Sequence, residues 1–287
     1  MNPTGARVTK QVLGGSRFEI AMRAPRPALR GAVPVLQGFD EHSAAPVRRR
    51  EFPHARVTLI LELGAPLRVR AGGRGAPHHH AGGFVAGLSS TFLATEHAGR
   101  QAGIELRMEP LAARAWLGVP LHELAQQPVS LDDLLPARAR GLAERAANER
   151  DWDARFDLVE DFLERAPRAS QRFLPLAWAA RRIEASGGRA RVGDLARELG
   201  YSRRRLIDGF RDAVGVTPKR YCRLVRFERL TQARQRMPRV SWACLAAGSG
   251  YFDESHLARD VAERTGLAPG AWADALAGTP LVEEPAP

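Results

Sequence analysis

The chain contains the stretch LARELGYSRRRL at residues 195–206 and a related stretch, LAAGSGYFDESHL, at residues 245–257. In each stretch, apolar residues at helical spacing lead to a glycine, and a residue that suits a helix N-cap follows. A second run of apolar residues at four-residue spacing then begins. The sequence therefore predicts the same unit twice: a helix, a glycine turn and a second helix.

The residues of each unit have distinct expected roles. In the first unit Leu195, Ala196 and Leu199 share a helical face, Gly200 ends that helix, and Ser202 caps the next. The second helix is expected to bury Leu206, Phe210 and Val214 and to end at Gly215. In the second unit, which is one residue longer between its glycines, the matching residues are Leu245, Ala246, Gly250, Asp253 as the cap, Leu257, Val261 and Gly266.

A helix, a glycine turn and a second helix make up the helix-turn-helix arrangement, whose second helix enters the major groove of DNA. One copy alone is weak evidence, because helical hairpins are common and most bind nothing. Two aligned copies are much stronger evidence. Each copy also has a similar ending, GVTPKRY at residues 215–221 and GLAPGAW at residues 266–272, in which the proline suits the first turn of another helix.

The segment between the units is predicted to be one long helix. Thr217-Pro218 favours a helix start, and Met237-Pro238 favours a break after Arg236. At a rise of ~1.5 Å per residue, such a helix is ~28 Å long. Successive major-groove segments on one face of B-DNA lie ~34 Å apart, so a monomer fits two recognition helices into one duplex.

Charge distinguishes the two units. The formal net charge is +11, and of the 43 basic residues only Lys10 and Lys219 are lysines. Residues 189–239 hold 15 basic and 5 acidic side chains, whereas residues 240–275 hold 2 basic and 5 acidic ones. We therefore expect the first unit to supply electrostatic affinity for DNA and the second to supply a finer selection.

Residues 171–275 resemble the DNA-binding domain of AraC/XylS-type transcription regulators. The resemblance rests on VGDLARELGYSRRRLIDGFRDAVGVTPKRYCRLVRFERL and CLAAGSGYFDESHLARDVAERTGLAP. It implies seven helices in this domain, double-stranded operator DNA as the partner, and recruitment or hindrance of RNA polymerase. It also implies a preceding domain that senses a small-molecule effector or forms a homodimer, frequently a cupin-like barrel. Ala268 and Ala273 depart from the pattern of this family.

The candidate DNA-binding residues lie on three helices. With Leu206 and Phe210 buried, the first recognition helix exposes Arg203, Arg204, Ile207, Asp208 and Arg211, and Arg205 is expected over phosphate. We predict that Arg204 contacts bases, because arginine binds guanine O6 and N7 bidentately. The connecting helix presents backbone-holding candidates, namely Lys219, Arg220 and Arg223. The second recognition helix exposes Glu254, Ser255, His256 and Arg259, which match DNA-contacting positions of similar proteins.

The first half of the chain is predicted to form short strands followed by helices. Hairpins are predicted over residues 56–70 and 91–108, the second turning near residues 98–100. Helices are predicted near residues 111–117, 137–149 and 151–165, the last capped by Asp151 and stopped by Pro167. We predict an α+β chain with a sensing or dimerisation domain at 10–165, a linker at 166–174 and a DNA-binding domain at 175–277.

Chemistry other than DNA binding has little support in the sequence. His78, His79 and His80 suggest a metal, but neighbouring residues on an extended chain point in different directions, so a glycine-rich loop is the preferred interpretation. Trp116 and Trp152 are expected in the core. No catalytic residue, cofactor site or metal site is assigned, because no nucleophile elbow, Walker loop or dinucleotide fingerprint occurs. The alternatives are a metal-dependent cupin-like enzyme tethered to DNA and a structural nucleic-acid binder without sequence preference.

Composition favours a soluble cytoplasmic protein that does not enter a membrane. Hydrophobic residues make up 44% of the 287 residues, and no apolar run reaches the ~18 to 20 residues that cross a bilayer. The N-terminal stretch has no apolar core typical of a secretory signal. Cys222 and Cys244 are too few for a disulfide scaffold and are expected to be small buried residues.

Overall fold

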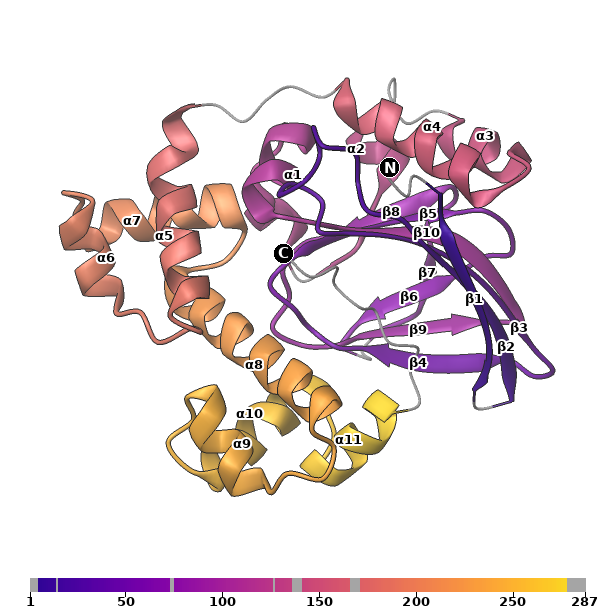
Figure 1. Cartoon of the computed structure of the whole chain (residues 1–287). Coiled ribbons are helices and arrows are strands. Elements are labelled where there is room, and N and C mark those ends of the chain that lie inside the picture. The colour runs from indigo at the N-terminus through magenta and orange to yellow at the C-terminus, as the bar shows by residue number, and fades with distance from the viewer. Residues whose placement is uncertain are drawn as a thin grey trace.

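The computed structural model describes residues 5–13, 15–72, 75–125, 127–135, 141–165 and 171–277. Two antiparallel sheets form the N-terminal half, and helices form the C-terminal half (Figure 1). The predicted α+β organisation, with strands first and helices last, is therefore confirmed. In the part of the chain that the structure describes, no helix combines the length and the apolar character that a membrane span needs.

The larger sheet has seven strands in the order β1-β2-β3-β10-β5-β8-β11, and every neighbouring pair is antiparallel. Its strands are β1 (Arg7–Leu13), β2 (Ser16–Met22), β3 (Val35–Ser43), β5 (Val57–Glu62), β8 (Gly83–Ala86), β10 (Arg100–Met108) and β11 (Val129–Ser130). The smaller sheet has the order β4-β9-β6-β7, formed by β4 (Val47–Glu51), β6 (Arg68–Ala71), β7 (His78–His79) and β9 (Leu93–His97).

Both predicted hairpins are wrong, although their strands exist. β5 and β6 belong to different sheets, as do β9 and β10. In each case the chain passes from one sheet to the other instead of pairing with itself. The backbone N–H of Leu67 donates to the Glu62 carboxylate at 2.8 Å, which fixes the first crossing. At the second crossing Gly99 has a φ of +107°, a conformation that favours glycine.

Alternation along β10 gives the larger sheet two different faces. Ile104 and Leu106 are fully buried in the main apolar cluster, together with the helix residues Trp152 and Phe156. These aromatic residues belong to α4 (Trp152–Glu164), which covers this face (Figure 1). A Cβ at Gly38 on β3 would lie 2.3 Å from the Trp152 ring, so only glycine allows this close packing.

The helices of the N-terminal half follow the strands. They are α1 (Pro110–Leu117), η1 (Leu121–Leu124), α2 (Leu131–Leu134), α3 (Leu142–Asn148) and α4. The predictions for α1 and α4 are confirmed, and Asp151 caps α4 by accepting from the Ala154 N–H at 2.9 Å. The helix predicted at 137–149 begins only at Leu142, and residues 137–140 and Pro167 lie outside the described residues.

Seven α-helices follow within residues 171–277, in agreement with the resemblance. They are α5 (Leu174–Ala185), α6 (Val192–Glu198), α7 (Arg203–Val214), α8 (Pro218–Arg236), α9 (Trp242–Ser249), α10 (Glu254–Thr265) and α11 (Pro269–Ala277). A short 3-10 helix, η2 (Gln171–Phe173), occupies part of the stretch predicted as a linker, whose residues 166–170 lie outside the description.

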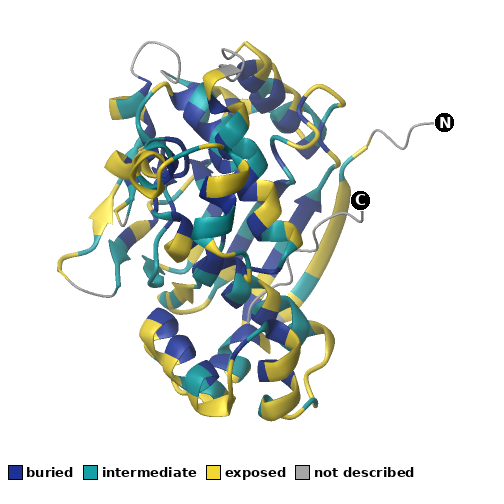
Figure 2. Ribbon diagram, turned by 90° about the vertical axis from the view of Figure 1, so that its left-hand side faces the viewer, coloured by how far each residue is buried: buried dark blue, intermediate teal, exposed yellow. Residues whose placement is uncertain are grey.

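The long helix α8 joins two apolar cores. Tyr221 and Leu224, in its first half, belong to the main cluster, which also contains the first unit and the N-terminal helices. Phe227 and Leu230, in its second half, belong to a separate cluster built by α9, α10 and α11. Figure 2 shows buried and exposed residues on opposite sides of these helices. The two halves of the helical domain are therefore packed independently and connected by one helix.

The structure tests the predictions for two tryptophans, the histidine run and the two cysteines. Trp116 and Trp152 are buried, as predicted. The glycine-rich loop predicted around His78 is wrong, because His78 and His79 form β7 and pair with β6. The pairing is supported by His79, whose Nε2 lies 2.9 Å from the Glu62 carboxylate. Cys222 is buried as expected, but Cys244 is exposed, because it lies on the outer side of α9.

Candidate DNA-binding surface and interdomain cavity

The first unit is α6 and α7, joined by a tight turn. Gly200 has a φ of +64°, and the Ser202 side chain accepts from the Arg205 N–H at 3.1 Å, so the predicted turn and cap are confirmed. Leu206 and Phe210 on α7 are fully buried. This packing turns the other side of α7 outward and leaves several of the predicted residues exposed, namely Arg203, Arg204, Arg205, Asp208 and Arg211.

Contacts within α7 distinguish its arginines. The Nε of Arg204 lies 3.6 Å from the Asp208 carboxylate, and the Arg204 side chain is 93% exposed. The Arg205 guanidinium lies 4.0 Å from the centre of the Tyr201 ring, so it stacks on the turn. Ile207 is half-buried beside them. The Arg204 side chain is therefore almost fully exposed to a partner, whereas the Arg205 guanidinium rests on the Tyr201 ring.

The start of α8 forms a second basic region. Thr217 caps the helix by accepting from the Arg220 N–H at 3.3 Å, and Lys219 and Arg220 are exposed. Arg211 and Arg220 line one hollow together with Thr217 and His122 of η1. An exposed helix N-terminus flanked by arginines is favourable for an anion. The structure thus brings together Arg211 and Arg220, which the sequence placed on different helices.

The second unit repeats the first with a different charge. Gly250 has a φ of +79°, and the Asp253 side chain accepts from the His256 N–H at 2.6 Å, which confirms the second turn and cap. Glu254, Ser255 and Arg259 are exposed on α10. His256 differs from the prediction because it is only half-exposed: its Nδ1 accepts from the Phe252 N–H at 3.3 Å, and its ring packs edge-on against Tyr251.

A buried ion cluster fixes α10 to α8. The Asp260 carboxylate receives hydrogen bonds from Arg264 at 3.0 Å, from Arg223 at 2.6 Å and from the Tyr251 hydroxyl at 2.9 Å. Burial alone would raise the pKa of Asp260, but the Arg264 charge and the hydrogen bonds hold it below the usual range. Arg223 also binds Glu263, so its guanidinium is engaged within the protein and not presented to a partner.

A cavity of about 300 Å³ lies where the two sheets meet α8. Its apolar walls come from strands of both sheets, with Phe18, Ile20, Phe39, Ile60, Phe84 and Leu93 among them. On the helical side it is lined by residues of α8 and α11, namely Glu228, Thr231, Gln232, Gln235 and Leu276. A bound molecule of this size would therefore contact both the sheets and helix α8, which joins the two helix-turn-helix units.

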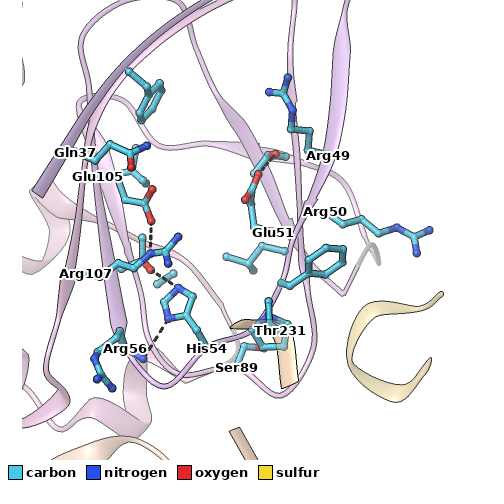
Figure 3. A pocket seen from close by; sticks show the side chains of 18 of the residues that line it. Gln37, Arg49, Arg50, Glu51, His54, Arg56, Ser89, Glu105, Arg107 and Thr231 are labelled. Carbon is cyan, nitrogen blue, oxygen red and sulfur yellow. Dashed lines mark hydrogen bonds and ion pairs between the residues drawn. The ribbon is translucent and has the colours of Figure 1, made fainter. Parts of the chain in front are cut away.

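The polar end of the cavity holds paired charges and a neutral histidine (Figure 3). Arg107 donates to the Glu105 carboxylate at 2.7 Å. The His54 Nδ1 accepts from the Arg56 N–H at 3.2 Å, and its Nε2 lies 3.1 Å from the Thr58 hydroxyl. Burial, followed by the charges of Arg107 and Arg56, holds the pKa of His54 well below its usual value, so the ring is neutral at pH 7.

Glu51 also faces this cavity (Figure 3). Withdrawal from bulk solvent, and then the like charge of Glu105, raise the pKa of the Glu51 carboxyl. The end of the cavity thus offers both donors and acceptors. This site was not among the predicted ones, although the sequence carries one signal for it. Glu105 and Arg107 alternate with apolar residues in β10, so they had to face away from the apolar core.

Comparisons with known proteins agree with this architecture. Residues 195–275 match a family described as a helix-turn-helix domain. No curated protein matches the chain. The solved structure of ToxT from Vibrio cholerae aligns with a TM-score of 0.50 and 9% identity, covering 84% of this chain and 98% of that one.

Two further structures resemble the chain. The structure of ToxT from Vibrio cholerae bound to (E)-4-(8-methylnaphthalen-1-yl)but-3-enoic acid has a TM-score of 0.50 and 10% identity, covering 84% of this chain and 99% of that one. The AraC-like transcriptional activator CuxR is 22% identical over 79% of this chain and 80% of its own, with a TM-score of 0.26. At such identities the ToxT alignments show a shared fold alone.

Proposed function

We propose that this DNA-binding transcription regulator recognises a specific duplex and responds to a small molecule. Its residues 195–275 form an AraC-type helix-turn-helix domain. One observation carries the first part of the proposal: two capped recognition helices with exposed N-terminal ends are joined by the 19-residue helix α8. At ~28 Å this helix is compatible with two contacts near one turn of B-DNA apart.

The two units contribute differently in this proposal. Arg204 reads a base, with Arg203, Ile207 and Asp208 beside it, while Lys219, Arg220 and Arg211 neutralise phosphates. The second unit selects the base sequence through Glu254, Ser255, His256 and Arg259. It adds little electrostatic attraction to the phosphates, because residues 240–275 carry more acidic than basic side chains.

A duplex selected by the protein from a randomised pool provides the test. The labelled selected duplex is competed at fixed salt with itself and with a scrambled duplex of equal composition. If the protein is a sequence-specific regulator, the scrambled duplex should compete at least 1,000-fold less well than the selected duplex, as is typical of specific binding. Equal competition by both duplexes would instead identify a binder without sequence preference.

The cavity is our candidate effector site, and its contacts suggest how binding reaches the DNA. β4 and the residues after β8 line the cavity through Arg50, Ser89 and Thr91. The same segments hold the end of α10: Arg50 donates to the Thr265 carbonyl at 2.8 Å, and the Phe92 N–H donates to the Arg264 carbonyl at 2.8 Å. A molecule that moves these segments would change the population of orientations of the second unit.

The chemistry of the cavity favours an effector with an apolar body and a polar end. ToxT, which shares this fold, has been solved with a naphthalenyl butenoic acid, a compound of that kind. The test measures DNA affinity with and without a panel of apolar carboxylic acids. Ala86→Leu, which narrows the cavity, should abolish any response, whereas Ala44→Leu, on the exposed surface, should preserve it.

Two further partners belong to the proposal. Recruitment or hindrance of RNA polymerase is the expected output, to be measured by in vitro transcription from a promoter that carries the selected duplex. Dimerisation through the N-terminal half is tested by sedimentation of the full chain with and without that duplex.

A further inference from the structure

Phe252 is the most conspicuous apolar side chain on the surface of the second unit. It is 92% exposed, more than any other exposed large hydrophobic residue of the described chain. Burying such a side chain is favourable, so leaving it in water forgoes that stabilisation. A single exposed apolar side chain is common on protein surfaces, so the position of Phe252 in the turn has to indicate what covers it.

The position of Phe252 is defined by comparing the two units. In the first unit, the turn runs Gly200-Tyr201 and continues directly into the cap Ser202. In the second unit, Gly250-Tyr251 is followed by Phe252 and only then by the cap Asp253. Phe252 is thus the additional residue of the second turn, placed immediately before the cap of α10, whose N-terminal end enters the groove in helix-turn-helix proteins.

The backbone around Phe252 is held on both sides. Tyr251 before it is buried and bonds to Asp260, and the Phe252 N–H itself donates to the His256 Nδ1 at 3.3 Å. Asp253 after it caps α10. The ring is therefore presented from a fixed turn, so little backbone ordering is needed when a partner covers it.

The surrounding charges decide which part of a duplex fits. The first turn of α10 carries Glu254 and no basic residue, and Asp253 lies beside it. Two carboxylates repel phosphate, so this corner is suited to base edges in the major groove. An apolar ring complements the thymine C5-methyl group, and a carboxylate accepts from cytosine N4.

We propose, building on the function proposed above, that Phe252 packs on a thymine methyl group in the half-site read by α10 and so contributes to sequence selection. It supplies the second unit with apolar affinity that does not depend on salt. Glu254 then favours a cytosine next to that thymine.

The test uses the duplex that the wild-type protein selects from a randomised pool. Each thymine of the α10 half-site is replaced in turn by deoxyuridine, which removes only the methyl group. For the wild-type protein we expect one replacement to weaken binding about fourfold, as for one buried methyl group. Phe252→Ala should bind the original duplex about tenfold more weakly and should lose its sensitivity to that replacement.

Controls separate the possible outcomes. Phe252→Leu retains an apolar side chain and should keep part of the methyl sensitivity, and Met237→Ala, which removes another exposed apolar side chain, should bind like the wild-type protein. If Phe252→Ala binds the selected duplex as tightly as the wild-type protein does, the inference is wrong. This also holds if Phe252→Ala loses only its effect on transcription, because the ring would then contact another protein and not DNA. Uniform insensitivity to deoxyuridine would overturn the thymine contact. Failure of the wild-type protein to select any sequence would instead refute the proposed function.

Discussion

Arg50 of β4 donates a hydrogen bond to the backbone carbonyl of Thr265, the last residue of α10, at 2.8 Å, although the two residues are 215 positions apart in the chain. The same guanidinium lies 4.8 Å from the centre of the Phe92 ring. A helix C-terminus carries partial negative charge, so an arginine at this position stabilises it. The second helix-turn-helix unit is therefore attached to the N-terminal half at the end of α10.

Arg50→Ala should release this attachment without unfolding either half. We expect faster hydrogen exchange in the last turn of α10, because one carbonyl loses its partner and Phe92 loses its stacked cation. Arg48→Ala is the matched control, since Arg48 lies on the same strand with a side chain that is 80% exposed. Equal exchange in the two variants would contradict the attachment.

Asp260→Asn should destabilise the second core. Asp260 and Arg264 form a pair whose side chains are 4% and 2% exposed, so the substitution leaves a buried cation without its counterion. We expect the free energy of unfolding to fall by about 3 to 5 kcal/mol, as measured by urea denaturation. Glu263→Gln should change it by less than about 1 kcal/mol, because the Glu263 side chain is 55% exposed.

The helical half could be predicted closely because its determinants are local. Gly200, Ser202 and Thr217 fix turns and caps through bonds to residues at most three positions away, and the four-residue spacing of Leu206 and Phe210 fixes the buried face. The charge of each exposed residue is also given directly by the sequence. For these reasons the limits of α7 and α8 and the exposure of Arg204 follow from the pattern alone.

The strands and the cavity depend on distant pairing, which one sequence does not specify. β5 pairs with β10, more than forty residues along the chain, instead of with the adjacent β6. Short apolar runs separated by a Gly-Ala-Pro turn look the same in both cases, so the hairpin prediction failed. The cavity combines β4, β10 and α8, and the position of Arg50 against Thr265 becomes visible only when these elements are placed in space.

Arg204→Ala and Arg220→Ala should weaken DNA binding in different ways. Arg204→Ala is expected to cost ~1 to 3 kcal/mol on the selected duplex and to relax the preference at one base pair. Arg220→Ala should weaken binding to all duplexes and reduce the dependence of affinity on salt by about one counterion. Arg197→Ala, on the exposed side of α6, is the control.

These two variants are compared by titrating the selected and scrambled duplexes at several salt concentrations. Identical behaviour of Arg204→Ala and Arg220→Ala would show that the division into base reader and phosphate clamp is wrong.

Glu41 should make the stability of the N-terminal half sensitive to acid. Burial alone would raise its pKa, but hydrogen bonds from Arg49, His97 and Ser16 and the Arg49 charge lower it from 4.5 to about 2. Because the folded-state pKa is lower than the unfolded one, the ionised carboxylate stabilises the fold above pH 4.5, and this stabilisation is lost as the pH falls toward 2.

Glu41→Gln isolates this contribution, because the glutamine keeps the shape but does not titrate. The free energy of unfolding is measured by urea denaturation from pH 7 downward for both proteins. We expect the wild-type protein to be more stable above pH 4.5 and the difference to shrink as the pH approaches 2. Near pH 2 the Glu41 carboxyl takes up a proton, so Arg49 would have an uncharged partner in both proteins. A difference that stays constant over this range would mean that the pKa of Glu41 is the same in the folded and the unfolded protein.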